Sequence, residues 1–101
     1  MQFKRNAEMN GTFLQGEVTA PYSKIVGVFG EPEAGDEYKC AFTWSMEFED
    51  GTSATLYDWK ETSLYNPDYP HPDTLKVRSA VDWHIGGHDK RAVERVLAAL
   101  T

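Results

Sequence analysis

The chain has 101 residues, ten of them basic and sixteen acidic, which gives a formal net charge of −6. That length holds one domain with one hydrophobic core, so residues 1–101 are treated as a single domain. Phosphate backbones are bound by clusters of lysine and arginine, which this sequence lacks, so direct binding of nucleic acid is disfavoured. No apolar run approaches membrane-spanning length and no signal-peptide pattern is present, so we expect a cytoplasmic protein with no membrane partner.

The first third of the chain predicts one strand and one short helix. Residues 1–10 are polar and unpatterned, and we expect a loose lead-in there. A strand is expected over residues 12–18, with Gly16 weakening it or marking a bulge. Thr19 is a candidate cap for the helix that follows, and Gly30 fits the position after its last turn. The helix itself is predicted by apolar residues at helical spacing, namely Tyr22, Ile25, Val26 and Phe29.

An acidic segment, residues 31–37, follows this helix and contains no hydrophobic residue larger than alanine. Its four acids are Glu31, Glu33, Asp36 and Glu37. A run of charge is most often a solvated loop, and a charged interaction edge is the alternative.

The middle of the chain, residues 39–60, predicts an aromatic β-hairpin. Apolar residues alternate with polar or small ones from Cys40 to Phe48, which is the period of a half-buried strand. Asp50-Gly51 supplies the positive φ angles of a tight turn. Residues 52–60 are rich in the β-branched and aromatic residues that favour a return strand.

Two registers of this hairpin are open. With a two-residue loop, Trp44 lies opposite Tyr57 and Phe42 opposite Trp59, so the aromatic residues of both strands share one face. With a three-residue loop that ends in a glycine bulge, Trp44 instead lies opposite Leu56.

Residues 61–74 contain three prolines, which excludes a helix or a central strand. A loop of this length is often functional, and Tyr65, Tyr69 and His71 give it groups suited to an interface. The alternative is that both tyrosines simply lie on the edge of the core.

The last quarter predicts a strand over residues 75–85 and a helix over residues 88–100 that Asp89, or less well His88, caps. The order β-α-β-β-β-α therefore predicts an α+β fold, a four-stranded antiparallel sheet with two helices packed on one face. The other face would meet water or a partner, and it would carry Thr43, Ser45, Glu47, Asp58, Lys76, Arg78 and His84.

The residues that carry chemistry form no catalytic constellation. His84 and His88 are spaced like a helical metal pair, but Gly86-Gly87 breaks any helix between them, and Cys40 is the single cysteine. We therefore expect no metal, no cofactor and no enzyme activity. The glycine pair before a helix start could instead form an anion site with His84 and His88, although the more common reason for such a pair is a sharp turn from strand to helix.

Three motifs together resemble a family of small, mostly uncharacterised proteins of bacteriophages and prophages. They are Phe29-Gly30-Glu31-Pro32, the hairpin string from Phe48 to Lys60, and the strand end from Trp83 to Gly87. The similarity extends from about Gly11 to Leu100. The family commonly has a larger β-branched residue at the position of Ser53, which implies the two-residue loop with Ser53 on the aromatic face. It carries no activity that transfers to this chain, and it implies a phage protein in the cytoplasm of a bacterial host.

Two functions follow as hypotheses. The first is a binding protein that inhibits a host defence or nucleic-acid-processing enzyme, anti-CRISPR inhibition being one form of this. Its candidate contacts are Glu31, Glu33, Asp36, Glu37, Glu47, Glu49, Asp50, Tyr65 and Tyr69. The alternative is a protein that binds or sequesters a nucleotide or phosphate ligand and so acts against host immune signalling. Its candidate contacts are His84, Gly86, Gly87 and His88, with Tyr57, Trp59 or Trp83 stacking on a base.

Overall fold

The computed structural model describes residues 2–7, 9–34 and 39–101, and the fold over these residues is α+β with an antiparallel sheet. In chain order the elements are β1 (Phe3–Arg5), β2 (Phe13–Ala20), α1 (Tyr22–Phe29), β3 (Glu33–Ala34), β4 (Phe42–Phe48), β5 (Ser53–Tyr57), α2 (Pro72–Leu75), β6 (Val81–Gly87) and α3 (Arg91–Leu100). The expectation of four strands and two helices is correct in class and wrong in detail, because β1, β3 and α2 add to it.

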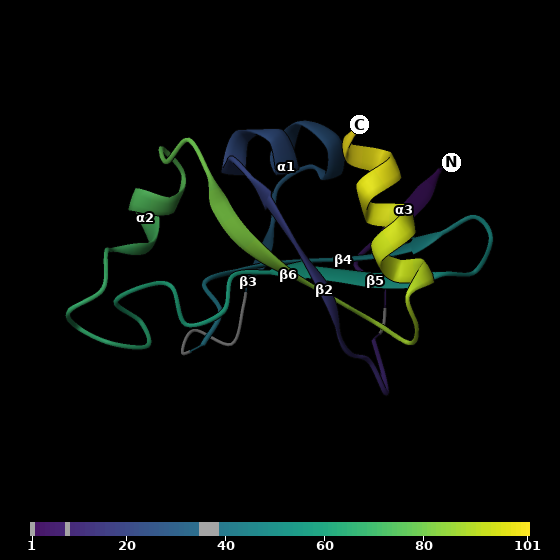
Figure 1. Cartoon of the computed structure of the whole chain (residues 1–101), viewed down its shortest axis with the longest axis horizontal. Coiled ribbons are helices and arrows are strands. Elements are labelled where there is room, and N and C mark those ends of the chain that lie inside the picture. Colours follow the sequence, from purple (N-terminus) through teal and green to yellow (C-terminus); the bar gives the residue numbers. More distant parts are fainter. Residues whose placement is uncertain (1, 8, 35–38) are drawn as a thin grey trace.

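The sheet has the strand order β1-β4-β5-β6-β2, and every pairing in it is antiparallel. The short strand β3 pairs with the first residues of β4, and β1 pairs with its last residues, so the two share one edge. Helices α1 and α3 lie together on one side of the sheet, and α2 lies at one end of the molecule (Figure 1).

The core lies between the sheet and the two long helices. Trp44 of β4 and Trp83 of β6 are fully buried, with their rings edge to face at 5.3 Å. Buried indole N–H groups need acceptors, and here Trp44 donates to the carbonyl of Gly30 at 2.8 Å and Trp83 to that of Ala20 at 2.9 Å. Both rings pack against Tyr22 of α1, so α1 covers this part of the core.

The hairpin of β4 and β5 adopts the three-residue register. Trp44 pairs with Leu56 and Thr43 pairs with Tyr57. The Phe48 amide donates to the carbonyl of Thr52, and Gly51 closes the loop with a φ of +88°. The two-residue register is therefore wrong.

This register separates the aromatic residues that the other one would have placed together. Trp44, Met46 and Phe48 stay in the core, while Tyr57 moves to the opposite face. Ser53 pairs with Glu47, which alternates with the core residues of β4, so it does not join the aromatic face either.

The N-terminal segment is a strand and not a loose lead-in. Residues 3–5 pair with the last three residues of β4, and the Phe3 ring packs 5.1 Å from Phe29 and 5.8 Å from Phe48. Arg5 donates to the carbonyls of Phe29, Glu31 and Ser45. These bonds tie β1 to the end of α1, because a guanidinium can serve several acceptors in one plane.

The proline-rich segment contains a short helix that we expected the prolines to exclude. Pro72 occupies the first helical position, where its missing N–H is not needed, and His71 caps the turn by accepting from the Asp73 amide at 3.1 Å. Leu75 ends this helix in the core, and β6 begins only at Val81. Lys76 and Arg78 consequently lie outside the sheet.

Three expected polar roles are also reassigned. Thr19 donates to the Asp82 carboxylate at 2.6 Å and does not cap α1, which Pro21 precedes without a side-chain bond. Ser45 and Asp58, expected on a wet face, are buried. Asp89 accepts from the Arg91 amide just before α3, but the N-cap residue of this helix is Lys90, which makes no side-chain capping bond, so Asp89 is not the cap that we expected.

No helix in the described part of the chain is long and apolar enough to cross a membrane.

Candidate binding face of the sheet

The sheet surface opposite α1 and α3 is called the open face here. Strand alternation turns Thr43, Thr55, Tyr57, His84 and Gly86 toward it. Among the described helices, both long ones lie on the other side, so the open face is reached by solvent or by a partner (Figure 1).

Trp59 reaches the open face because Asp58 fixes the end of β5. The Asp58 carboxylate is fully buried and accepts from the amides of Ala41 and Phe42 at 2.7–3.0 Å. Those bonds turn Asp58 into the protein and leave Trp59 36% exposed beside Tyr57.

Three rings gather at this end of the open face. The Trp59 ring is stacked on His84 with an interplanar angle of 22° and a centroid distance of 6.1 Å, and Tyr57 meets both rings edge-on. His84 Nε2 is 3.0 Å from the carboxylate of Glu17 on β2. Burial raises the pKa of the Tyr57 hydroxyl above its ordinary value.

Two lysines accompany Trp59. The ammonium groups of Lys39 and Lys60 lie 5.4 and 5.3 Å from the centre of its ring. The Lys60 amide donates to the Lys39 carbonyl at 2.7 Å, which holds the two residues side by side. Lys60 has a φ of +58°, a left-handed conformation that lysine seldom adopts.

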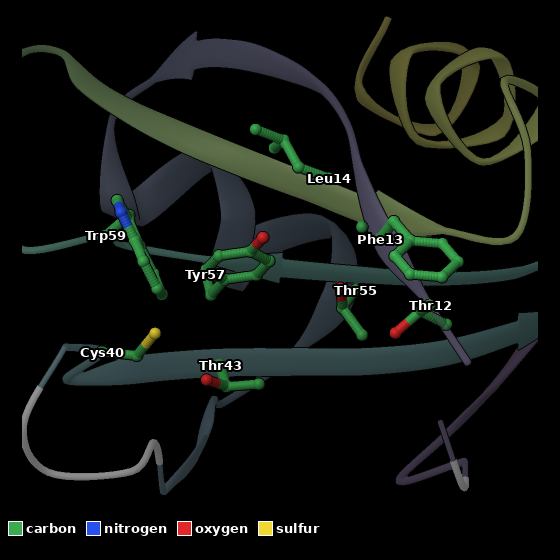
Figure 2. Close-up of a pocket in the computed structure, with 9 residues that line it drawn as sticks. Thr12, Phe13, Leu14, Cys40, Thr43, Thr55, Tyr57 and Trp59 are labelled. Atoms are coloured by element: carbon green, nitrogen blue, oxygen red, sulfur yellow. The ribbon is translucent and has the colours of Figure 1, made fainter. Parts of the chain in front are cut away.

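A hollow of about 330 Å³ lies in the middle of the open face (Figure 2). Tyr57 and Trp59 line one end, Phe13 lines the other, and Leu14 stands above the floor (Figure 2). The lining consists of Thr12, Phe13, Leu14, Cys40, Thr43, Thr55, Tyr57, Trp59 and Gly86. None of these residues carries a carboxylate.

Gly86 shapes the floor of this hollow, because a Cβ there would overlap the Thr55 hydroxyl. Gly87, its neighbour, faces the other way, and a Cβ on it would overlap the Ala92 side chain of α3. The two glycines therefore serve opposite faces of the sheet and do not form one anion cradle.

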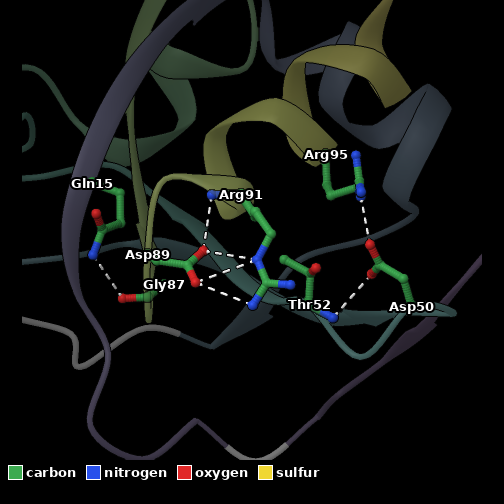
Figure 3. Close-up of polar contacts among 7 residues, drawn as sticks. All are labelled: Gln15, Asp50, Thr52, Gly87, Asp89, Arg91 and Arg95. Atoms are coloured by element: carbon green, nitrogen blue, oxygen red, sulfur yellow. Dashed lines mark hydrogen bonds and ion pairs between the residues drawn. The ribbon is translucent and has the colours of Figure 1, made fainter.

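The start of α3 is already occupied by a carboxylate of this chain. Asp89 accepts from the Arg91 amide at 2.9 Å, and its other oxygen is 3.1 Å from the Arg91 guanidinium (Figure 3). His88 is exposed nearby. At the predicted anion site, the Arg91 amide therefore already donates to Asp89 and not to a ligand.

Several of the predicted acidic contacts are paired within the molecule. Glu33 forms an ion pair with Arg5 at 2.9 Å and accepts from the Ser45 amide and hydroxyl. Burial acts to raise the pKa of Glu33, but the hydrogen bonds from Arg5 and Ser45 outweigh it and lower the pKa. Glu47 lies 4.0 Å from Lys4 on the neighbouring strand.

Asp50 is likewise engaged at the hairpin tip. It accepts from the Thr52 amide at 3.0 Å and from Arg95 of α3 at 2.8 Å (Figure 3). The Thr52 amide first, and then Arg95, lower the pKa of Asp50 to about 2. Glu31 and Glu49 are exposed, and Asp36 and Glu37 lie outside the described residues.

The two tyrosines of the proline-rich segment lie close to each other, with ring centroids 6.4 Å apart. Tyr69 is exposed, and the Lys60 ammonium lies 5.0 Å from the Tyr65 ring. Lys60 thus connects this segment to Trp59.

The described residues contain no group of His, Cys, Asp and Glu that could hold a metal ion. A scan of the sequence against protein-family models finds no matching family, and a search of curated proteins likewise finds no match.

The sequence suggested Tyr57, Trp59 or Trp83 as a stacking group. The structure brings Tyr57 and Trp59 to the hollow with Gly86, whereas Trp83 is fully buried in the core and cannot stack on a ligand. Sequence reasoning missed Phe13, Leu14 and Lys60. Consecutive apolar residues at the start of a strand were the available indication for Phe13 and Leu14. No pattern in the sequence indicated Lys60, because its role depends on a backbone conformation.

Proposed function

We propose that this chain is a binding protein without catalytic activity that docks a protein partner on the open face of its sheet. One observation supports this most directly. Apolar and aromatic side chains are exposed together around the hollow, with Phe13 70%, Leu14 54% and Trp59 36% exposed. Clustered exposure of this kind is typical of an interaction surface, whereas single exposed hydrophobic residues are ordinary.

The shape of the hollow favours a protein over an enclosed small molecule as the main partner. Drug-sized ligands usually have most of their surface buried in a pocket, whereas this hollow is open along the sheet. Interfaces between proteins commonly place an aromatic or aliphatic anchor in such a depression. Tyrosine, tryptophan and phenylalanine, which line this one, are enriched in such interfaces.

The pairing of the acidic residues also moves the proposed contact surface. Glu33 and Asp50 form ion pairs with Arg5 and Arg95 inside this chain. Their carboxylates are therefore less available to bind a partner than the sequence alone suggested. Glu31 and Glu49 are exposed and remain available as charges that speed association with a basic partner.

The target class follows from the phage resemblance and from the acidic balance of the chain. We propose that the partner is a host defence or nucleic-acid-processing enzyme and that docking inhibits it. Anti-CRISPR inhibition is one form of this function.

The test compares two glutamates introduced at exposed apolar positions. Leu14→Glu puts a charge on the open face, and Val77→Glu puts the same charge at a residue that is 83% exposed and does not line the hollow. Each full chain is immobilised, exposed to bacterial lysate, and its bound proteins are quantified by mass spectrometry.

We expect a protein that the native chain and Val77→Glu retain and Leu14→Glu loses. Circular dichroism and thermal melts of the three proteins establish that each is folded. Retention of every specific partner by Leu14→Glu would overturn the open face as the docking surface.

A further inference from the structure

We infer that the outer edge of β2 is the site at which a second copy of this chain pairs, strand against strand. Within the described part of the chain, the only strand bonded to β2 is β6, which leaves the other edge of β2 to solvent or to another molecule. A free strand edge carries unpaired N–H and C=O groups, which are a template for another strand. This inference does not rest on the docking of a host protein, because that uses the open face.

The two edges of the sheet differ in how well they are protected from pairing. One edge is formed by β1 and β3, which have three and two residues, and β1 carries Lys4 and Arg5. Short strands and charged side chains both discourage pairing with another chain. Strand β2 has eight residues and a single charged one, Glu17, whose carboxylate lies 3.0 Å from His84 Nε2. Of these two edges, β2 is therefore the one suited to accept a strand.

The regular part of this edge is the segment Gly16–Ala20. A bulge between Leu14 and Gly16 precedes it, and Pro21, which has no N–H to donate, follows it. Its last carbonyl, that of Ala20, already accepts from the Trp83 indole. Along the segment, alternate residues direct their N–H and C=O groups away from β6. These outward groups are the ones that a second strand would bond.

An apolar groove of about 440 Å³ lies beside this segment, on the side of the sheet that carries the helices. Its lining includes Val18 and Ala20 of β2 and Leu97 and Leu100 of α3. Leu97 is 39% exposed there. A strand added to β2 would bring its own side chains over this groove, because every second residue of a strand points to the same face. Backbone pairing and apolar burial would then occur at one place.

A second copy fits this edge because antiparallel pairing of β2 with itself is self-complementary. A two-fold axis perpendicular to the sheet keeps α1 and α3 of both copies on the same side. With the axis at Val18, the centre of Gly16–Ala20, Val18 of one copy lies opposite Val18 of the other, and Glu17 lies opposite Thr19. The two grooves meet at this axis, because Val18 lines each of them. The apolar residues of each copy then cover those of the other.

Other positions of the axis are less favourable. An axis at Glu17 would place two carboxylates directly opposite each other. An axis at Thr19 would place Glu17 opposite Pro21, which lacks the N–H that a ladder needs. An axis between two residues would bring side chains of different faces opposite each other. Val18 is therefore the position at which all five residues of the segment can pair.

The first test is the mass of the native full chain in solution. Sedimentation equilibrium is measured from about 1 μM to about 1 mM, which covers modest affinities. We expect a reversible equilibrium between one chain and two. Each copy carries a net charge of −6, so the copies repel each other and the dimer should become more stable as salt increases. An interface built on ion pairs would weaken instead.

Two exposed hydrophobic residues provide matched variants. Leu97→Lys puts a charge into the groove, and Val77→Lys puts the same charge at a residue that is 83% exposed and does not line the groove. We expect Leu97→Lys to raise the dissociation constant of the dimer at least about tenfold, because its ammonium group would meet apolar side chains. Val77→Lys should leave the constant unchanged. Circular dichroism and thermal melts establish that both variants are folded.

A cysteine at the proposed axis tests the register. Directly opposite residues of an antiparallel pair are close enough for a disulfide. With oxidised glutathione, two copies of the Val18→Cys variant should therefore cross-link. Val77→Cys should cross-link far more slowly at the same concentration, and the native chain, with Cys40 as its single cysteine, measures the background.

Three results would overturn the inference. The first is the mass of a single chain at every concentration and salt. The second is an equal dissociation constant for Leu97→Lys and Val77→Lys. The third is cross-linking of Val18→Cys that is no faster than that of Val77→Cys while the dimer is populated. None of them bears on capture of a host protein, because Leu14 lines the hollow of the open face and precedes the paired segment. Failure of self-pairing and failure of protein docking are therefore distinguishable.

Discussion

The two faces of the sheet are built from the same three central strands and differ in burial: one is covered by helices and the other is open. Strands β4, β5 and β6 turn Trp44, Leu56 and Trp83 toward α1 and α3, where all three are fully buried. The same β5 and β6 turn Tyr57 and His84 to the open face, where both are half-buried. Because neighbouring residues of a strand point to opposite faces, a shift of one position in the hairpin would exchange the residues that β5 presents to the two faces.

The difference between the faces shows what each tryptophan does. Trp44 and Trp83 have both their ring and their indole N–H satisfied inside the protein. Trp59 is packed by Tyr57 and His84 on the open face and still keeps a third of its surface exposed. Aromatic surface that the fold does not bury remains available for a partner.

The largest expected effect compares two tryptophans, one on each face. Trp44→Ala should lower the free energy of unfolding by roughly 3–5 kcal/mol, the usual loss for a buried large aromatic side chain. Trp59→Ala should lower it by about 1 kcal/mol, since it removes ring contacts at a partly exposed position. Urea melts measure both. Equal losses for the two variants would mean that Trp59 is a core residue, and the proposed binding face would then be wrong.

The sequence predicted the core strands because alternation and helical spacing are strong over these residues. It could not choose the hairpin register, since Asp50-Gly51 is compatible with both a two-residue and a three-residue loop. In the structure the hairpin has the three-residue loop, which ends in a bulge at Gly51 with a φ of +88°. The assignment of Tyr57 to a face, and with it the candidate site, depended on that choice.

Other misses have equally local causes. The strand β1 has only three residues and pairs with β4 more than 40 residues away, so no local periodicity indicates it. The helix α2 begins with Pro72, a position at which proline is favoured even though it breaks a helix interior. Glu33 lies in a segment whose composition is typical of a solvated loop, and only the folded chain brings Arg5 and Ser45 into contact with it.

The second prediction compares the two faces of the sheet at two adjacent glycines, Gly86 on the open face and Gly87 on the face covered by α3. Gly87→Ala should lower the free energy of unfolding by roughly 1–3 kcal/mol, because the new methyl group overlaps Ala92 and lies 3.1 Å from the Ser53 carbonyl. Gly86→Ala meets only the Thr55 hydroxyl at overlapping distance. The loss of unfolding free energy caused by Gly86→Ala should therefore largely disappear when Thr55→Ala is added. Adding Thr55→Ala to Gly87→Ala should not restore stability.

Chemical denaturation of the single and double variants measures this coupling directly. The result also bears on the hollow, since a side chain at residue 86 would occupy its floor. Rescue of Gly87→Ala by Thr55→Ala would show that Gly87 faces the hollow too, contrary to the structure.

The smallest effect concerns the tip of the hairpin, where Asp50 attaches the covered side of the sheet to α3. The Thr52 amide and Arg95 hold the pKa of Asp50 at about 2, below its usual value of 3.8. A carboxyl whose pKa is lower in the folded chain stabilises the fold above the unfolded value, and this contribution is lost as pH falls through the folded value. The stability difference between the native chain and Asp50→Asn should therefore be constant above about pH 4 and diminish toward pH 2.

The two partners of Asp50 should be separable by salt. The Arg95 ion pair lies at the surface, so added salt should weaken its part of the pH dependence, whereas the short bond from the Thr52 amide should respond little. Thermal melts of the native chain, Asp50→Asn and Arg95→Gln from pH 5 to pH 2, at low and high salt, measure this. A pH dependence in Arg95→Gln that equals that of the native chain at low salt would assign the lowered pKa to the Thr52 amide alone. The hairpin tip would then be held by its own turn and not by its attachment to α3.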